Sequence, residues 1–226
     1  MKIFKFGGAS VKDAAGVRNL IHVLETVGYK ETLVVVSAMG KTTNALEKII
    51  DEYFINKTQI PSGIIELKEY HLQIVKELFE ENQTLVSERI HFYFDELQLF
   101  LKNNKAPNYS FVYDQVVSYG ELLSTTIIQH YFLEKGWDSF WLDARNCIKT
   151  DDYYRAANLN WEETQSQIKN ETKGHNLIIT QGFIGSNSNN FTTTLEREGS
   201  DYSAAIFAYA LNADSVTIWK DVPGVL

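Results

Sequence analysis

The sequence is poor in residues that cross-link a protein or anchor it in a membrane. Of its 226 residues only Cys147 is a cysteine, so no internal disulfide can form, and no Cys/His spacing typical of zinc sites occurs. No apolar run approaches the roughly 20 residues that a membrane helix needs, and the first ten residues hold no secretory apolar core. We therefore expect a cytoplasmic protein with no membrane partner.

Positive charge is scarce as well. The chain has 21 Lys and Arg against 29 Asp and Glu, a formal net charge of −8, which argues against nucleic acid as a partner. What remains is an ordinary globular composition, with 44% hydrophobic and 22% charged residues. A chain of this length can bury a hydrophobic core without the help of a metal or a disulfide.

Short strand-like runs alternate with longer helical stretches, as in an α/β fold with a mostly parallel sheet. The runs that predict strands lie at 3–6, 32–37, 138–142, 177–183 and 215–219. Apolar periodicity near 3.6 predicts helices at about 11–28, 41–57, 62–82, 84–104, 119–135, 161–172 and 200–212.

Three features bear on domain organisation. The consecutive helices within 62–104 indicate a helical insertion in the α/β body, and the polar turn at 186–190 indicates a hairpin. No repeat or long linker divides the chain, which favours one domain. The sequence stops at Val225–Leu226, directly after a strand and a turn, and we interpret this as a fragment of a longer protein.

The segment Lys5–Ser10 (KFGGAS) lies where the first strand gives way to a helix. Two glycines allow close approach of the backbone to an anion, and Lys5 adds a positive charge, so phosphate binding is one interpretation. A tight turn, with Ser10 and Asp13 as a helix N-cap pair, is the other.

Three more segments combine polar side chains with element boundaries. Ser118-Tyr-Gly-Glu121 has the spacing of a capping box, and Glu121 is alternatively a partner for an ammonium group at the mouth of a cleft. Arg197 could clamp a carboxylate or belong to a solvated surface network. Lys220 and Asp221 follow the last strand, where ligands of parallel sheets gather.

In their order along the chain, seven motifs resemble the catalytic domain of aspartate kinases. They are Lys5–Ser10 (KFGGAS), Ser37–Asn44 (SAMGKTTN), Val117–Glu121 (VSYGE), Thr150–Asp152 (TDD), Gln181–Gly185 (QGFIG), Thr193–Ser203 (TTLEREGSDYS) and Asp221–Gly224 (DVPG). That family has the amino acid kinase fold. The resemblance implies a three-layer sandwich with helices on both faces of a mostly parallel sheet, and residues 1–226 as one such domain without regulatory domains.

The resemblance also implies an activity, the ATP- and Mg²⁺-dependent phosphorylation of the L-aspartate side chain in the biosynthesis of lysine, threonine and methionine. The implied catalytic residues are Lys5, which would neutralise the transferring phosphoryl group, and Asp201, which would orient Lys5. The aspartate pocket would consist of Thr43, Glu121, Phe183, Arg197, Ser200 and Asp201. The nucleotide and its phosphates would contact Lys5, Gly7, Gly8, Ser10, Lys220 and Asp221.

The implied chemistry agrees with the residue types in the motifs. A carboxylate is already ionised at neutral pH, so its attack on a phosphoryl group needs positioning and charge neutralisation rather than a strong base. Alternatives remain open: another amino acid kinase, of the acetylglutamate or glutamate kinase type, or a non-catalytic amino-acid-binding module. A homo-oligomer of the complete protein is also left open.

Two departures from the family pattern lead to further expectations. Glu196 and Glu198 flank Arg197 where the family has glycines, and side-chain alternation in an extended segment predicts that both face away from the pocket. In the family the chain continues after the Asp221–Gly224 turn with more nucleotide-binding residues. We therefore expect the 226-residue chain to keep the aspartate half of the site and to bind nucleotide poorly.

Overall fold

A computed structural model describes residues 1–57, 61–196 and 199–220. Its main sheet has five parallel strands in the order β3-β4-β2-β1-β7. Their bounds are β1 Lys2–Phe6, β2 Thr32–Val36, β3 Phe140–Leu142, β4 Leu177–Gln181 and β7 Ser215–Trp219. All four pairs of neighbouring strands are parallel, so the carboxyl ends of the strands meet at one edge of the sheet.

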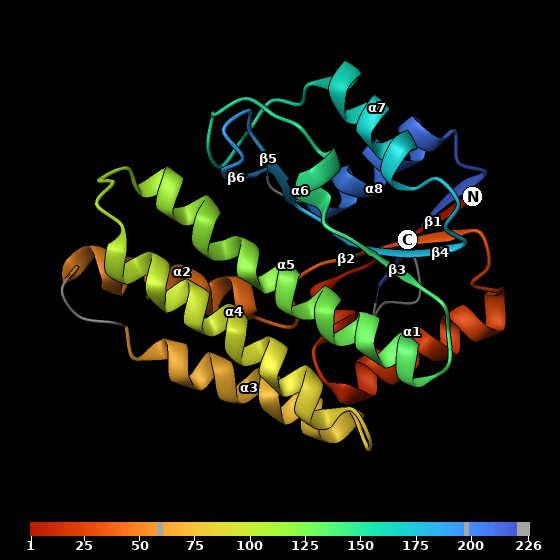
Figure 1. Cartoon of the computed structure of the whole chain (residues 1–226), viewed down its shortest axis with the longest axis horizontal. Helices are drawn as coiled ribbons and strands as arrows, with labels where there is room; N and C mark the ends of the chain where they lie inside the picture. Colours follow the sequence, from red (N-terminus) through yellow and green to blue (C-terminus); the bar gives the residue numbers. More distant parts are fainter. Residues whose placement is uncertain (58–60, 197–198, 221–226) are drawn as a thin grey trace.

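Helices cover both faces of this sheet (Figure 1). One layer holds α1 Ala14–Val27, α2 Thr42–Ile55, α3 Gly63–Leu78, α4 Gln83–Asn103 and α5 Tyr109–Glu134. The other holds α6 Ala144–Cys147, α7 Trp161–Glu171 and α8 Gly199–Leu211. The expected three-layer α/β arrangement is confirmed.

The alternation of side chains along β2 explains why two cores form. Val34 and Val36 pack into the core on the side of α1 to α5, whereas Leu33 and Val35 pack into the core on the side of α8. Successive side chains of a strand point to opposite faces, so a continuous apolar strand of this kind requires cover on both sides.

The helices α3 and α4 pack against each other and against α2 and α5 (Figure 1). Their apolar faces join the core of that layer through residues such as Ile74 and Phe94. A small antiparallel hairpin of β5 Ile184–Ser186 and β6 Thr192–Thr194 stands beside the main sheet, with its turn in the polar segment predicted to form one.

Two local predictions are wrong. The capping box at Ser118 does not exist, because α5 begins ten residues earlier than the 119 expected, at Tyr109 with Asn108 as its N-cap. Ser118 lies within that helix and donates its hydroxyl to the Gln115 carbonyl. The second is the start of the first helix near residue 11 with Ser10 in its cap: Ser10 lies in a 3₁₀ turn, η1 Gly8–Val11, and α1 begins at Ala14. Asp13, the other member of the predicted cap pair, is the N-cap of α1 and accepts a hydrogen bond from the Gly16 N–H.

Candidate active site

A cavity of about 340 Å³ opens at the carboxyl ends of the strands, where ligands of parallel sheets bind. Its lining comes from β1, from the segments that follow β2, β4 and β7, and from α2, α5 and α8. The lining residues are Lys5, Ser37, Thr43, Glu121, Phe183, Gly199, Ser200, Asp201 and Lys220. Seven of these were predicted as site residues from the sequence, so the structure brings together segments from both ends of the chain.

Lys5 and Asp201 form an ion pair in this cavity. The Lys5 Nζ lies 2.6 Å from the Asp201 Oδ1, and both side chains are largely shielded from solvent, at 10% and 26% exposed. Lys5 faces α8 because its neighbours Phe4 and Phe6 alternate to the other face of β1. An ammonium group is therefore held in the cavity by a carboxylate from the first turn of α8.

Glu121 is a buried carboxyl group in which one of the two oxygens lacks a hydrogen-bond partner among the described residues. The residue is 3% exposed, and its Oε1 accepts a hydrogen bond of 3.2 Å from the Ala38 N–H, two residues after the end of β2. Its buried Oε2 has no hydrogen-bond partner among the described residues. Burial raises the pKa of the Glu121 carboxyl to about 8, although the Ala38 N–H partly opposes that shift. An incoming cation would satisfy both the free oxygen and the charge.

Phe183 enters the cavity from a tight turn after β4. Its φ of +70° lies in the left-handed region, which bulky side chains rarely adopt. The preceding Gly182 allows close packing, because a Cβ there would lie 2.5 Å from the Ser200 Oγ. The turn and the first turn of α8 thus lie directly against each other, and each contributes a wall of the cavity.

The glycine segment borders the cavity at Lys5. A Cβ on Gly7 would lie 3.5 Å from the Lys5 Nζ, so the missing side chain leaves open space beside the ammonium group. Gly8 has a packing role, since a Cβ there would lie 2.4 Å from the Ala38 carbonyl oxygen. Ser10 donates its backbone N–H to the Gly7 carbonyl. Gly7, Gly8 and Ser10 are not among the residues that line the cavity.

Two predicted site residues, Arg197 and Asp221, lie outside the described residues, as does Glu198. Glu196 is exposed and lines a separate cavity with Trp161 and Tyr202, which agrees with the expectation that it faces away from the site. Ser37 and Gly199 line the cavity and were not singled out beforehand, although both stand inside motifs that were.

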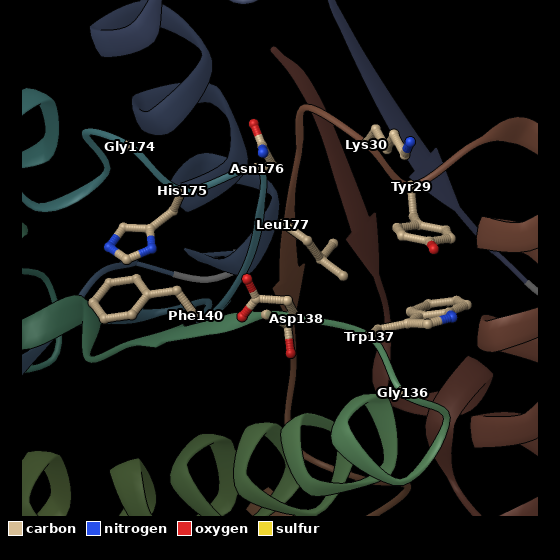
Figure 2. Close-up of a pocket in the computed structure, with 11 residues that line it drawn as sticks. Tyr29, Lys30, Gly136, Trp137, Asp138, Phe140, Gly174, His175, Asn176 and Leu177 are labelled. Carbon is tan, nitrogen blue, oxygen red and sulfur yellow. The ribbon is translucent and has the colours of Figure 1, made fainter.

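Another hollow, of about 420 Å³, lies at the opposite, amino end of the sheet (Figure 2). Two ring pairs flank it, Tyr29 stacked on Trp137 and Phe140 stacked on His175. Its residues come from the segments that lead into β2, β3 and β4, and none of the predicted site residues lines it. Of these two cavities, the one at the carboxyl ends of the strands contains the Lys5–Asp201 ion pair and the buried Glu121 carboxyl. We therefore take that cavity as the candidate active site.

Across residues 1–57, 61–196 and 199–220, no three His, Cys, Asp or Glu side chains come together in a way that could hold a metal ion. Within the same ranges no helix is long and apolar enough to cross a membrane.

Comparison with known proteins adds family information. The profile of the amino acid kinase family matches residues 1–226. The lysine-sensitive aspartokinase 3 of Escherichia coli (strain K12) is 31% identical over an alignment of 227 residues, which covers 99% of this chain and 49% of that protein. The chain thus spans about half the length of this relative.

Solved structures of E. coli aspartokinase III are similar throughout the chain. The complex with lysine and aspartate superposes with a TM-score of 0.88 at 29% identity, covering 100% of this chain and 50% of that one. The complex with aspartate and ADP gives a TM-score of 0.87 at the same identity and coverage.

Proposed function

Since the chain belongs to the amino acid kinase family, we propose that residues 1–226 form the catalytic domain of an aspartate kinase, with α3 and α4 as a helical insertion. The reaction is the transfer of the γ-phosphoryl group of ATP to the side-chain carboxylate of L-aspartate, which yields 4-phospho-L-aspartate and ADP. The observation that carries the proposal is the buried Glu121 carboxyl, which has an unpartnered Oε2 among the described residues and lines the same cavity as the Lys5–Asp201 ion pair.

Glu121 supports an amino acid as the substrate. A buried carboxyl with a free oxygen is a strong site for an ammonium group, because the cation removes the cost of burying the negative charge. Phe183 and Ser200 would form the walls around the substrate, and Thr43 would add a hydroxyl from the first turn of α2. Arg197, by its place in the motif, would bind a substrate carboxylate through two parallel hydrogen bonds.

Lys5 supports phosphoryl transfer. A carboxylate oxygen of aspartate attacks the γ-phosphorus while the bond to the β–γ bridging oxygen breaks, and the electron pair leaves with ADP. Negative charge on the transferring group needs a fixed cation, and such preorganised charge is the main source of catalysis in phosphoryl transfer. Lys5 would supply that cation, held in orientation by Asp201, with open space beside it at Gly7.

The nucleotide would approach from the side of Gly7, Gly8 and Ser10, with Lys220 and Asp221 near its ribose and base. Mg²⁺ would be held mainly by the ATP phosphates, as is common for this ion, and would neutralise charge on them. The complexes of E. coli aspartokinase III with aspartate and with ADP support both choices of ligand.

The test is a calorimetric titration of the chain with L-aspartate, L-glutamate and N-acetyl-L-glutamate, followed by an assay of ADP release by the complete enzyme with the same acceptors. The proposal predicts binding of L-aspartate in preference to the other two compounds, and ADP release only with L-aspartate. Preference for N-acetyl-L-glutamate would contradict it, because an acetylated amine carries no ammonium for Glu121. Aspartate binding by the complete enzyme without any affinity for Mg-ATP would favour an amino-acid-binding module.

A further inference from the structure

Ser203 links two parts of the candidate site without lining its cavity. It lies on α8, one turn after Gly199, and is fully buried. Its hydroxyl donates a hydrogen bond of 2.8 Å to the Gly199 carbonyl and accepts one of 2.9 Å from the Phe183 N–H. The bond to the carbonyl four residues earlier is ordinary for a serine inside a helix. The bond to Phe183, which reaches another element, is not.

Phe183 needs such a partner because its backbone is strained. A non-glycine residue in the left-handed region costs about 1–3 kcal/mol and persists only where its surroundings fix it. Here the φ is +70°. The Ser203 hydroxyl holds the N–H of Phe183, and the Leu195 N–H holds its carbonyl at 2.9 Å. The two bonds together keep the peptide groups on both sides of the ring in place.

Close packing couples the same turn to the first turn of α8. A Cβ on Gly199 would lie 2.6 Å from the Phe183 ring, and a Cβ on Gly182 would lie 2.5 Å from the Ser200 Oγ. There is little room for one turn to shift without the other. A change in the Phe183 backbone would therefore reach Ser200 and Asp201, which stand at the start of α8.

We propose that Ser203 is a positioning residue for L-aspartate. By binding the Phe183 N–H and the Gly199 carbonyl at once, its hydroxyl holds the aromatic wall and the start of α8 at the spacing that shapes the cavity. The inference rests on the proposed function, because Phe183, Ser200 and Asp201 are the walls assigned there to the substrate. Ser203 itself contacts neither substrate nor nucleotide.

The test compares Ser203→Ala with Ser203→Thr. Titration calorimetry measures the affinity for L-aspartate, and hydrogen exchange followed by NMR measures the protection of the Phe183 amide. Ser203→Ala should weaken aspartate binding about tenfold, since a lost hydrogen bond and a small displacement both act on binding geometry. It should also speed exchange of the Phe183 amide. Ser203→Thr should stay near the wild-type values in both, because a helical threonine can keep the bond to the carbonyl four residues back.

A matched control is Thr172→Val. The buried Thr172 hydroxyl also donates to a carbonyl four residues earlier, that of Ile168 at 2.7 Å, but at the end of α7 and away from the cavity. Thr172→Val should lower the melting temperature about as much as Ser203→Ala and leave aspartate affinity unchanged.

The outcomes separate the two proposals. If Ser203→Ala leaves Phe183 exchange or aspartate affinity at the wild-type value, the positioning role is wrong. The same holds if Thr172→Val weakens aspartate binding equally, because the effect would then be one of general stability. A wild-type chain that binds no aspartate contradicts the proposed function. Phe183 exchange in Ser203→Ala then still decides whether Ser203 holds the turn.

Discussion

The Lys5 ammonium and the Asp201 carboxylate lie 2.6 Å apart, although one belongs to the first strand and the other to the last helix described. The pair is largely shielded from solvent, so its two charges interact more strongly than they would at the surface. It also fixes the direction of the Lys5 side chain. On the proposed function, a phosphoryl group that entered the cavity would meet an ammonium already in position, which is the preorganisation that electrostatic catalysis requires.

Replacing Lys5 by alanine should therefore lower turnover about a hundredfold or more, by analogy with the loss of one charge-stabilising donor elsewhere. A steady-state assay of ADP release in the complete enzyme measures the effect. Lys2→Ala is the matched control. Lys2 belongs to the same strand, but its ammonium contacts the carbonyls of Val27 and Gly28 at the surface. A loss below threefold for Lys5→Ala would make Lys5 a structural residue of β1.

Glu121 should make aspartate binding depend on pH. Burial raises the pKa of this carboxyl to about 8 in the free protein, so at pH 7 it is mostly protonated. A bound ammonium group favours the carboxylate, and binding at pH 7 should therefore release nearly one proton. Affinity should rise up to about tenfold per pH unit between pH 6 and pH 8. Calorimetry in buffers of different ionisation enthalpy counts the protons.

Glu121→Gln tests whether the proton released on aspartate binding comes from Glu121. The amide keeps an oxygen for the Ala38 N–H but cannot ionise, so the variant should bind aspartate weakly and release no proton. The folded-state pKa is raised above the ordinary 4.5. The stability that this carboxyl contributes is hence present at low pH and is lost as the pH rises through about 8. Glu121→Gln should accordingly gain stability relative to wild type at pH 9. Affinity for aspartate that is flat from pH 6 to pH 8 would contradict the assignment.

The sequence was sufficient for the order of the main-sheet strands and of the longer helices, but it missed the short helix α6 and misplaced the start of α5. An amphipathic helix can be recognised in a sequence because apolar residues recur along one of its faces. Helix α5 is instead buried nearly all round, including polar residues such as Asp114 and Thr125. The absence of a polar face hid its first ten residues, nearly three turns. Ser118 and Glu121, which mimic a cap, then suggested a start at the wrong place. Local signals cannot distinguish such a mimic from a cap, because the difference lies in tertiary burial.

The residues of the candidate site also fall into those that the sequence predicted and those that it could not. The motif order gave Lys5, Glu121 and Asp201, which share one cavity. The role of Ser203 could not have been foreseen, since a serine inside a helix ordinarily bonds to its own helix. Only the tertiary contact with Phe183 distinguishes it. Residues that act through another residue leave no mark in spacing or composition.

The strain at Phe183 can be measured by comparing two truncations. Phe183→Ala and Phe183→Gly both remove the ring, yet only glycine adopts a φ of +70° without penalty. The glycine variant should be more stable than the alanine variant by about 1 kcal/mol, the reverse of the order expected at ordinary positions. Chemical denaturation of both proteins gives the difference. Equal stabilities, or a more stable alanine variant, would mean that the turn relaxes out of the left-handed region once the ring is gone.

Asp114 should stabilise the surroundings of the site in a manner that depends on pH. This fully buried carboxylate of α5 accepts hydrogen bonds from the backbone N–H groups of Arg155 and Thr194 and from the Thr194 hydroxyl. It thereby joins α5, the loop at Arg155 and strand β6. In Asp114→Asn an amide NH₂ would face these donors, so we expect a loss of about 2 kcal/mol and a fall in melting temperature of about 4–8 °C.

The pH dependence of that loss tests the electrostatic part. Burial raises the pKa of Asp114 from the ordinary 3.8 to about 6, and the hydrogen bonds from Thr194 and Arg155 only partly oppose the shift. Because the folded pKa is the higher one, the stability contributed by Asp114 is present at low pH and is lost as the pH rises through 6. The asparagine variant lacks this titration. Its deficit relative to wild type should therefore be larger at pH 5 than at pH 7.5, by about 1 kcal/mol, in denaturation curves recorded at both pH values. A deficit that grows with pH would show instead that the hydrogen bonds outweigh burial and that the Asp114 carboxylate is the stabilised form.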